Sequence, residues 1–252
     1  MFPYDPVLAA AVRTSPQSIT DVLQTLQTIE ANCSDGDGLK WFNWLYLQVS
    51  QAVENRVASG GFNAPAWLAK LDVQFARLYF GALEGALSSS STPDCWQTLF
   101  DCRDQTSIAR IQFALAGINA HINHDLPAAI VATCQATATV PERSAPQFAD
   151  YTSLNSTFDS LIESAKHALH VRLLGQALPP ASHLEDLIAA WGVSGARETA
   201  WSNAEILWRL RREPPLDSTL MDTSTDSPPL LTKLYSSPFL ERRVEGAPAA
   251  SG

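Results

Sequence analysis

Apolar residues recur at steps of three and four along most of this 252-residue chain. One such stripe consists of Leu68, Leu71, Phe75, Leu78 and Ala82, and another of Ile108, Ile111, Leu115, Ile118 and Ile122. This spacing places the apolar side chains on one face of an α-helix, and that face must be buried against other helices. We find no clear alternation of apolar and polar residues of the kind that is typical of strands. The sequence therefore predicts an all-α fold.

Caps and turn residues separate the predicted helices. Ser18 and Asp21 have the spacing of a capping box, Gly60 and Gly61 end a helix, and Pro65 suits the first turn of the next one. Six to seven helices are expected, at about residues 18–31, 41–59, 65–87, 95–102, 106–139, 150–174 and 183–212. We predict a single bundle-like helical domain over residues 1–213 and a poorly ordered tail over residues 214–252, which is rich in Pro, Ser, Thr and Asp.

Charge and composition narrow the classes of partner. The formal net charge of -9 argues against nucleic acid or an anionic membrane as the main partner. No stretch approaches the roughly 20 apolar residues of a membrane span, and the first residues lack the pattern of a secretory signal. The cysteines form no C-x-x-C pair, and Cys95 and Cys102 are expected to be buried free thiols rather than a disulfide. These features predict a cytoplasmic protein.

A polar segment, Asn119 to Pro127, interrupts one of the apolar stripes. At about 100° per residue, Asp125 falls near the centre of the stripe and His121 falls on its edge. The other polar residues of the segment, Asn119, Asn123 and His124, are expected to point elsewhere. A carboxylate that faces a core is costly unless it is paired, hydrogen-bonded or bound to a metal. The segment therefore predicts a buried polar site.

His121 and Asp125 are four residues apart, so their side chains are neighbours on one helix face. A carboxylate beside an imidazole prepares it as a general base. The same two residues would also serve as ligands of a divalent metal, together with ligands from facing helices. Alternatively, they belong to a core network that fixes helix packing. Pro127 leaves a further alternative, in which the helix is not continuous and Asp125 caps a new helix that begins at Leu126.

Further polar candidates lie outside this segment. Arg197 is expected either to neutralise Asp125, to bind an anionic group of a substrate, or to pack over the tryptophans of the last helix. Asn155 and Asp72 are inward-facing candidates for substrate contacts. Three residues have the spacing of metal ligands but lie opposite the apolar stripe of their helix, and are expected to be solvated: Glu163, His167 and His170. The chain carries no Walker loop, G-x-G-x-x-G, G-x-S-x-G or H-E-x-x-H motif, so no nucleotide cofactor is expected.

Several segments together resemble the DUF5995 family, a family of unknown function. The resemblance spans roughly residues 40–210 and rests mainly on the segment from Gly117 to Pro127. Supporting segments are Trp44 with Tyr46, Trp67 to Asp72 with Phe75 and Tyr79, and Ala196 to Trp201 with Leu207 and Trp208. The resemblance implies a helical domain and gives weight to Asn119, His121, Asn123 and Asp125. It implies no particular reaction.

These observations support two hypotheses of different classes. In the first, the chain is an enzyme that acts on a small, largely apolar molecule by acid/base or metal-assisted chemistry, such as hydrolysis, elimination or cyclisation. Its catalytic residues are His121, Asp125 and Arg197, its substrate-binding residues are Asn119, Asn123, Asn155, Asp72 and Trp201, and the metal ligands of the metal-assisted variant are His121 and Asp125. In the second, the chain is a non-catalytic ligand-binding or interaction protein. An apolar pocket on the order of a few hundred Å3 beside His121 would favour an enzyme or a ligand-binding protein. A filled core at this position would favour a purely structural role of the polar residues.

Overall fold

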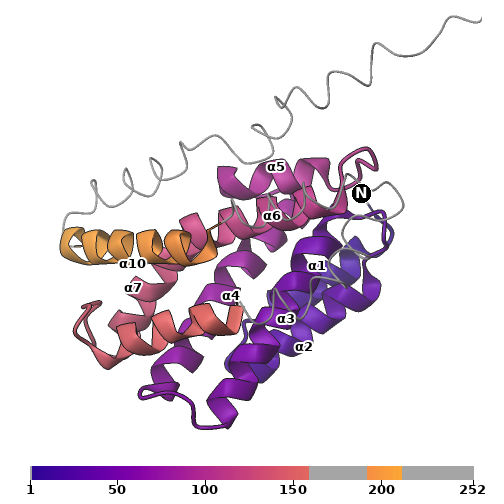
Figure 1. The fold of residues 1–252 in the computed structure, drawn as a ribbon. Helices are drawn as coiled ribbons and strands as arrows, with labels where there is room; N and C mark the ends of the chain where they lie inside the picture. The colour runs from indigo at the N-terminus through magenta and orange to yellow at the C-terminus, as the bar shows by residue number, and fades with distance from the viewer. Residues whose placement is uncertain (1, 159–191, 212–252) are drawn as a thin grey trace, which may run out of the picture.

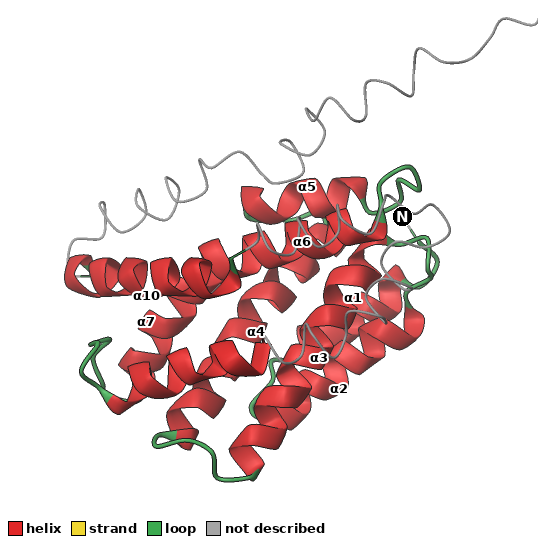
Figure 2. Cartoon of the chain, in the orientation of Figure 1, coloured by secondary structure: helices red, strands yellow, loops and turns green. Residues whose placement is uncertain are grey.

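The computed structural model describes residues 2–158 and 192–211, and all regular structure in these ranges is helical (Figure 2). This confirms the all-α prediction. The elements are α1 (Asp5–Arg13), α2 (Ile19–Asn32), α3 (Gly38–Ala58), α4 (Pro65–Leu87), α5 (Asp94–Cys102), α6 (Arg110–Ala120), the π-helix η1 (His121–Asp125), α7 (Leu126–Ala136) and α10 (Val193–Leu210). Residues 146–158 are also helical. The predicted tail, as well as Glu163, His167 and His170, lies outside the described residues.

The structure describes more helices than the six to seven that were predicted, for two reasons. The first is α1, which was not among the predicted helices. The second is η1, which divides the long helix predicted from residue 106 into α6 and α7. Helix starts that depend on local chemistry agree well with the prediction. The capping box is formed, with the Asp21 N–H donating to Ser18 Oγ (3.1 Å) and the Ser18 N–H donating to the Asp21 carboxylate (3.0 Å), and α4 begins at Pro65.

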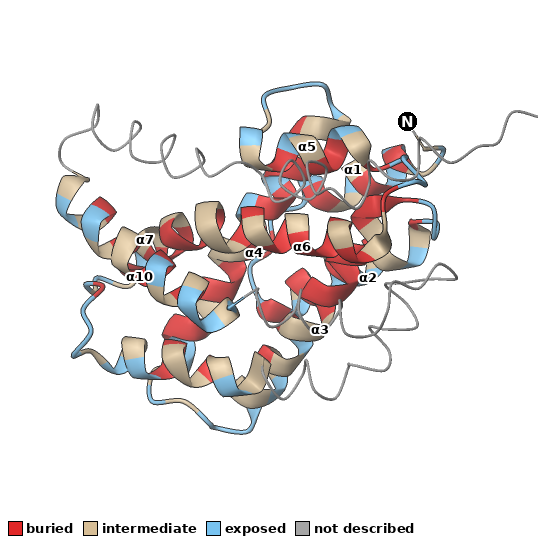
Figure 3. Cartoon of the chain, turned by 45° about the horizontal axis from the view of Figure 1, so that its top comes forward, coloured by how far each residue is buried: buried red, intermediate tan, exposed pale blue. Residues whose placement is uncertain are grey.

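Helix α4 lies at the centre of the molecule. It contacts α1, α2, α3, α5, α7 and η1, while α2 packs along α3, and α10 packs along α7 (Figure 1). Buried residues are concentrated on the sides of α3, α4 and α6 that face the interior (Figure 3). None of the helices within residues 2–158 and 192–211 combines the length and the apolar character needed to cross a membrane.

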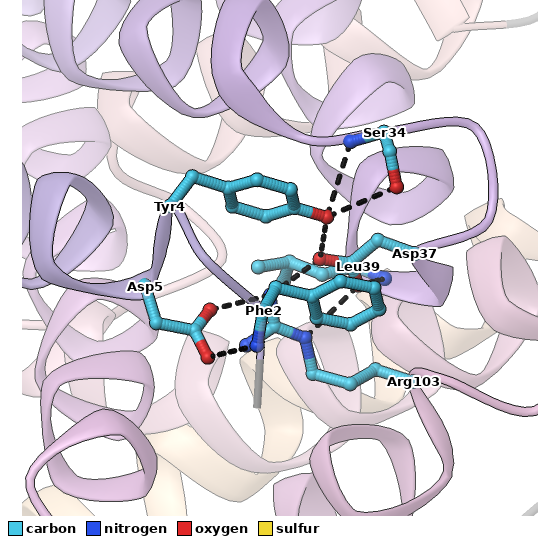
Figure 4. Close-up of polar contacts among 7 residues, drawn as sticks. All are labelled: Phe2, Tyr4, Asp5, Ser34, Asp37, Leu39 and Arg103. Carbon is cyan, nitrogen blue, oxygen red and sulfur yellow. Dashed lines mark hydrogen bonds and ion pairs between the residues drawn. The ribbon is translucent and has the colours of Figure 1, made fainter.

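A buried ionic cluster fixes α1 and α5 against the start of α3 (Figure 4). Arg103, which follows α5, donates from Nε to the Asp37 carboxylate (2.9 Å) and pairs through Nη2 with Asp5 (3.0 Å). Tyr4 donates its hydroxyl to Asp37 (3.0 Å), and Asp37 also caps α3 by accepting from the Leu39 N–H (3.0 Å). Because these partners come from three separate parts of the sequence, the cluster explains why α1 is held in place.

Helices α3 and α6 approach closely where Gly117 faces the ring of Phe42. A Cβ at position 117 would overlap with that ring, so Gly117→Ala is expected to lower the free energy of unfolding by about 1–3 kcal/mol through overpacking. Gly81→Ala is the matched control, because Gly81 lies within α4 and a Cβ added there would meet no atom within 4 Å. That control is expected to gain about 0.5–1 kcal/mol from helix propensity. Urea unfolding of both variants measures the difference, and equal effects would contradict the close approach.

Candidate functional site

The predicted polar segment contains a π-turn rather than a regular α-helical turn. In η1, the Leu126 N–H donates to the carbonyl of His121, five residues earlier. A π-turn rotates less per residue than an α-turn, so side-chain directions predicted from an α-helix shift across it. The shift corrects two expectations. His124 does not point away from Asp125, and the side chain of Asp125 makes no cap hydrogen bond to α7.

The Asp125 carboxylate is 1% exposed and accepts three hydrogen bonds. His121 Nδ1 (2.8 Å) and Trp96 Nε1 (3.0 Å) contact Oδ2, and His124 Nδ1 (2.8 Å) contacts Oδ1. Burial by itself would raise the pKa of Asp125, but the hydrogen bonds from His121 and His124 hold that pKa below its ordinary value. Asp125 is therefore an ionised carboxylate in the core.

His124 supplies the positive charge that balances Asp125. The hydrogen bond to Asp125, with a smaller contribution from Cys95, raises the pKa of His124 to about 10 in spite of its burial. His124 is therefore protonated at neutral pH, and it forms an ion pair with Asp125. This pairing explains how an ionised carboxylate is tolerated at this depth.

His121 is neutral, because burial lowers its pKa more strongly than the hydrogen bond with Asp125 raises it. An ionised carboxylate can only accept, so His121 Nδ1 must carry the proton in their hydrogen bond, and Nε2 must carry a lone pair. His121 Nε2 is buried and has no hydrogen-bond partner within the described residues. A buried acceptor without a partner is uncommon and calls for an explanation.

Aromatic rings from α3, α4 and α5 hold the imidazole of His121. The Phe75 ring stacks on it, with ring centroids 3.4 Å apart and an interplanar angle of 6°. Tyr46 approaches edge-on at 4.7 Å, and Phe42 and Trp96 both lie at 5.8 Å. The ring is therefore fixed in one orientation, which keeps the Nε2 lone pair in a constant direction.

His121 lines an apolar cavity of about 80 Å3 between α3, α4, η1 and α10. Its other walls include Leu45, Val49, Ile122 and Phe158. The cavity is smaller than the few hundred Å3 typical of drug-sized ligand sites. A larger and more polar hollow of about 650 Å3 lies elsewhere, between α5 and the connection from α4, and it is lined by neither His121 nor Arg197. The cavity beside His121 suits only a small molecule.

Arg197, on α10, lines the same cavity and is 5% exposed. Its Nε donates to Asn155 Oδ1 (2.8 Å), and its Nη2 donates to the carbonyl of Tyr151 (2.7 Å). The prediction that Arg197 neutralises Asp125 is wrong, because His121, His124 and Trp96 occupy the carboxylate. Asn155 instead orients the guanidinium group.

The model of the family described as "Family of unknown function (DUF5995)" matches residues 19–233. The chain belongs to the DUF5995 family. A search of the curated proteins and a search of the solved structures each found no match. In this DUF5995 protein, the aromatic residues that carried the resemblance surround the site, since Tyr46, Phe75 and Tyr79 all lie within contact distance of the His121 ring.

None of the five residues that were predicted to contact substrate lines the cavity, and Asn155 instead binds Arg197. Asn123 and Asn119 bond to each other on the helix surface, with Nδ2 to Oδ1 at 2.8 Å. Trp201 is fully buried and packs against other rings of the core: Trp67, Phe148 and Tyr151. Asp72 is buried elsewhere in the core, and burial raises its pKa to about 7, with a further contribution from the charge of Glu54.

The metal hypothesis finds little support in the site geometry. His121 Nδ1 and Asp125 Oδ2 face each other in a 2.8 Å hydrogen bond, so neither atom is directed at a shared ion. Among the described residues, no group of three or more His, Cys, Asp or Glu side chains is arranged to hold a metal ion. The four cysteines are free, as expected, but Cys95 and Cys102 are half-buried rather than buried. The residues present do not form a metal-ligand set.

Sequence reasoning missed Trp96 and the contact between His124 and Asp125. Trp96 is fully buried, and its indole N–H needs an acceptor in the core, which Asp125 provides. The available signal was the presence of a tryptophan in the short predicted helix 95–102, but its acceptor lies in another helix. The His124 contact depends on the π-turn, for which the only local sign is Pro127, whose missing N–H weakens the regular hydrogen-bond pattern.

Proposed function

We propose that this protein is an enzyme that uses His121 as a general base on a small, largely apolar molecule bound in the cavity beside it. The observation that carries the proposal is the buried His121 Nε2, which has a lone pair and no partner within the described residues. A histidine that serves only the core is expected to have both ring nitrogens satisfied. Here Asp125 fixes one ring nitrogen, and the His121 side chain lines a cavity.

The proposed chemistry starts with a proton transfer. His121 Nε2 takes a proton from a C–H group of the substrate or from a water molecule, and the electron pair of the broken bond stays on the substrate or the hydroxide. Asp125 holds Nδ1–H and stabilises the imidazolium that forms. The apolar walls exclude bulk water, which strengthens this electrostatic support. Base-catalysed hydrolysis, elimination and cyclisation each use such a proton transfer.

A second candidate is a non-catalytic ligand-binding protein. The observation in its favour is that the Asp125 carboxylate is fully occupied by three donors, as in a network that only fixes packing. In that alternative, the polar network fixes helix packing and the cavity only stores a ligand. The two candidates differ in whether a bound molecule loses a proton to His121.

The test is hydrogen–deuterium exchange on small carbonyl compounds in D2O, followed by proton NMR. The panel contains short ketones, esters, lactones and 2-oxo acids. Wild type is expected to exchange the acidic C–H of at least one compound, and His121→Gln is expected to slow that exchange by about 10²-fold or more. Glutamine is chosen because alanine would leave a cavity beside Phe75. Circular dichroism and melting curves establish that the variant folds.

Arg143→Gln is the control, since Arg143 is 46% exposed and pairs with Glu198 on the surface. It is expected to exchange at the wild-type rate. Exchange in His121→Gln at the wild-type rate would contradict the role of His121. If compounds bind to wild type and none exchanges, the ligand-binding alternative is the better description.

A further inference from the structure

Arg197 carries a buried positive charge for which the described residues provide no carboxylate partner. Its two hydrogen-bond acceptors, Asn155 Oδ1 and the Tyr151 carbonyl, are both neutral. Its guanidinium carbon lies 4.0 Å from the centroid of the Tyr151 ring and 4.8 Å from that of Phe158. Burial lowers the pKa of Arg197, yet an arginine keeps its charge in a protein. A buried charge of this kind is costly unless an opposite charge joins it.

The surroundings of Arg197 hold the guanidinium group in place without neutralising it. Nε and Nη2 are occupied by Asn155 and Tyr151, whereas Nη1 makes no hydrogen bond to any described residue. Asn155 and the carbonyl of Tyr151 both lie on the helical segment 146–158, so the orientation is set by a neighbouring helix. A pre-oriented guanidinium group with an unused N–H edge is suited to a carboxylate, whose oxygens match its planar fork.

Arg197 and His121 lie on the walls of one cavity. Both side chains line it, and the walls between them are hydrocarbon, with Leu45, Val49 and Ile122 among them. Asp125 does not compete with the negative end of a ligand for Arg197, because His124 already balances its charge. A ligand that satisfies the cavity therefore needs one negative end and an apolar body.

We propose that the ligand is a short-chain monocarboxylate, bound through its carboxylate to Arg197 with its hydrocarbon end in the cavity beside His121. A cavity of about 80 Å3 equals roughly three waters at about 30 Å3 of liquid each, so it has room for a hydrocarbon end of about three carbons. This proposal about the ligand rests on the proposed function in one respect, namely that the substrate binds in this cavity. It does not require His121 to act as a base.

The experiment compares sodium butyrate with butyramide, its neutral counterpart of the same size, by NMR titration of the full chain at constant ionic strength. Wild type is expected to bind butyrate at least about 10-fold more tightly than butyramide. Arg197→Gln is expected to remove that preference, and Arg143→Gln, a surface arginine next to α10, is expected to keep it. Val49→Trp fills the cavity from its half-buried wall and is expected to abolish butyrate binding.

The wild-type comparison of the two compounds keeps the proposal testable even if Arg197→Gln fails to fold. Equal affinity for butyrate and butyramide, or no binding of butyrate in the millimolar range, would overturn the proposal. Binding that survives Val49→Trp would also overturn it, since the ligand would then lie elsewhere. Butyrate binding that depends on Arg197, combined with unchanged exchange in His121→Gln, would support the ligand class while contradicting the catalytic role of His121.

Discussion

Asp125→Ala is expected to lower the free energy of unfolding by about 3–5 kcal/mol, because it removes the acceptor of a buried charged network. Trp96 Nε1–H and His121 Nδ1–H would be left without their shared acceptor in the core, and His124 would lose its ion-pair partner. Asp125→Asn keeps the volume and one acceptor oxygen, so its loss is expected to be smaller. Chemical unfolding monitored by circular dichroism measures both values.

Asp101→Ala is the matched control, since Asp101 is an exposed carboxylate on α5, and its removal should change stability by no more than about 0.5 kcal/mol.

The loss of stability caused by Asp125→Ala should also depend on pH. Because the folded pKa of Asp125 is lowered, its contribution is lost as the pH falls below 3.8. Because the folded pKa of His124 is raised to about 10, its contribution is present below 6.5 and is lost as the pH rises towards 10. A cost no greater than that of Asp101→Ala would contradict the buried network.

Asp72→Asn is expected to stabilise the protein above neutral pH and to have little effect near pH 4. The folded pKa of Asp72 is about 7, against an ordinary value of 3.8, because burial disfavours the charged form and the Glu54 charge adds to this effect. Between these two pH values the folded state holds a proton that the unfolded state has released. Raising the pH across this window therefore destabilises wild type relative to the variant, by on the order of 2–4 kcal/mol.

The measurement is the difference in unfolding free energy between wild type and Asp72→Asn at several pH values from 4 to 8, so that the other titrating groups cancel. Glu54→Gln is a second variant. It removes the neighbouring charge on α3, which lowers the folded pKa of Asp72, so the total destabilisation on raising the pH is expected to be smaller. Tyr46, also on α3, stays protonated in this range, since burial and the charge of Asp72 raise its pKa well above its ordinary value. A difference that is constant across this range would mean that Asp72 is ionised in the folded protein.

The predictions made from sequence succeeded where the cause is local. Apolar spacing and caps depend on residues within one or two turns, which is why the capping box at Ser18 and the start of α4 at Pro65 were predicted. The inward direction of His121 and Asp125 followed from the same periodicity. Helix α1 is an exception, since its nine residues are amphipathic but were not predicted as a helix. Its position also depends on Arg103, which lies far along the chain.

Local patterns in the sequence were enough to predict that the fold is helical, where α2, α4 and α5 begin, and which polar segment enters the core. How that segment is used depends on the packing of the helices around it. Periodicity gives a side-chain direction relative to its own helix axis, but a partner on another helix depends on how the two axes pack. For this reason Trp96 was not recognised as a donor to Asp125. For the same reason, Asp125 was considered as the partner of Arg197, whereas the structure shows that Arg197 binds Asn155. The π-turn at η1 turned His124 towards Asp125, because one residue more per turn changes every direction predicted for a regular helix.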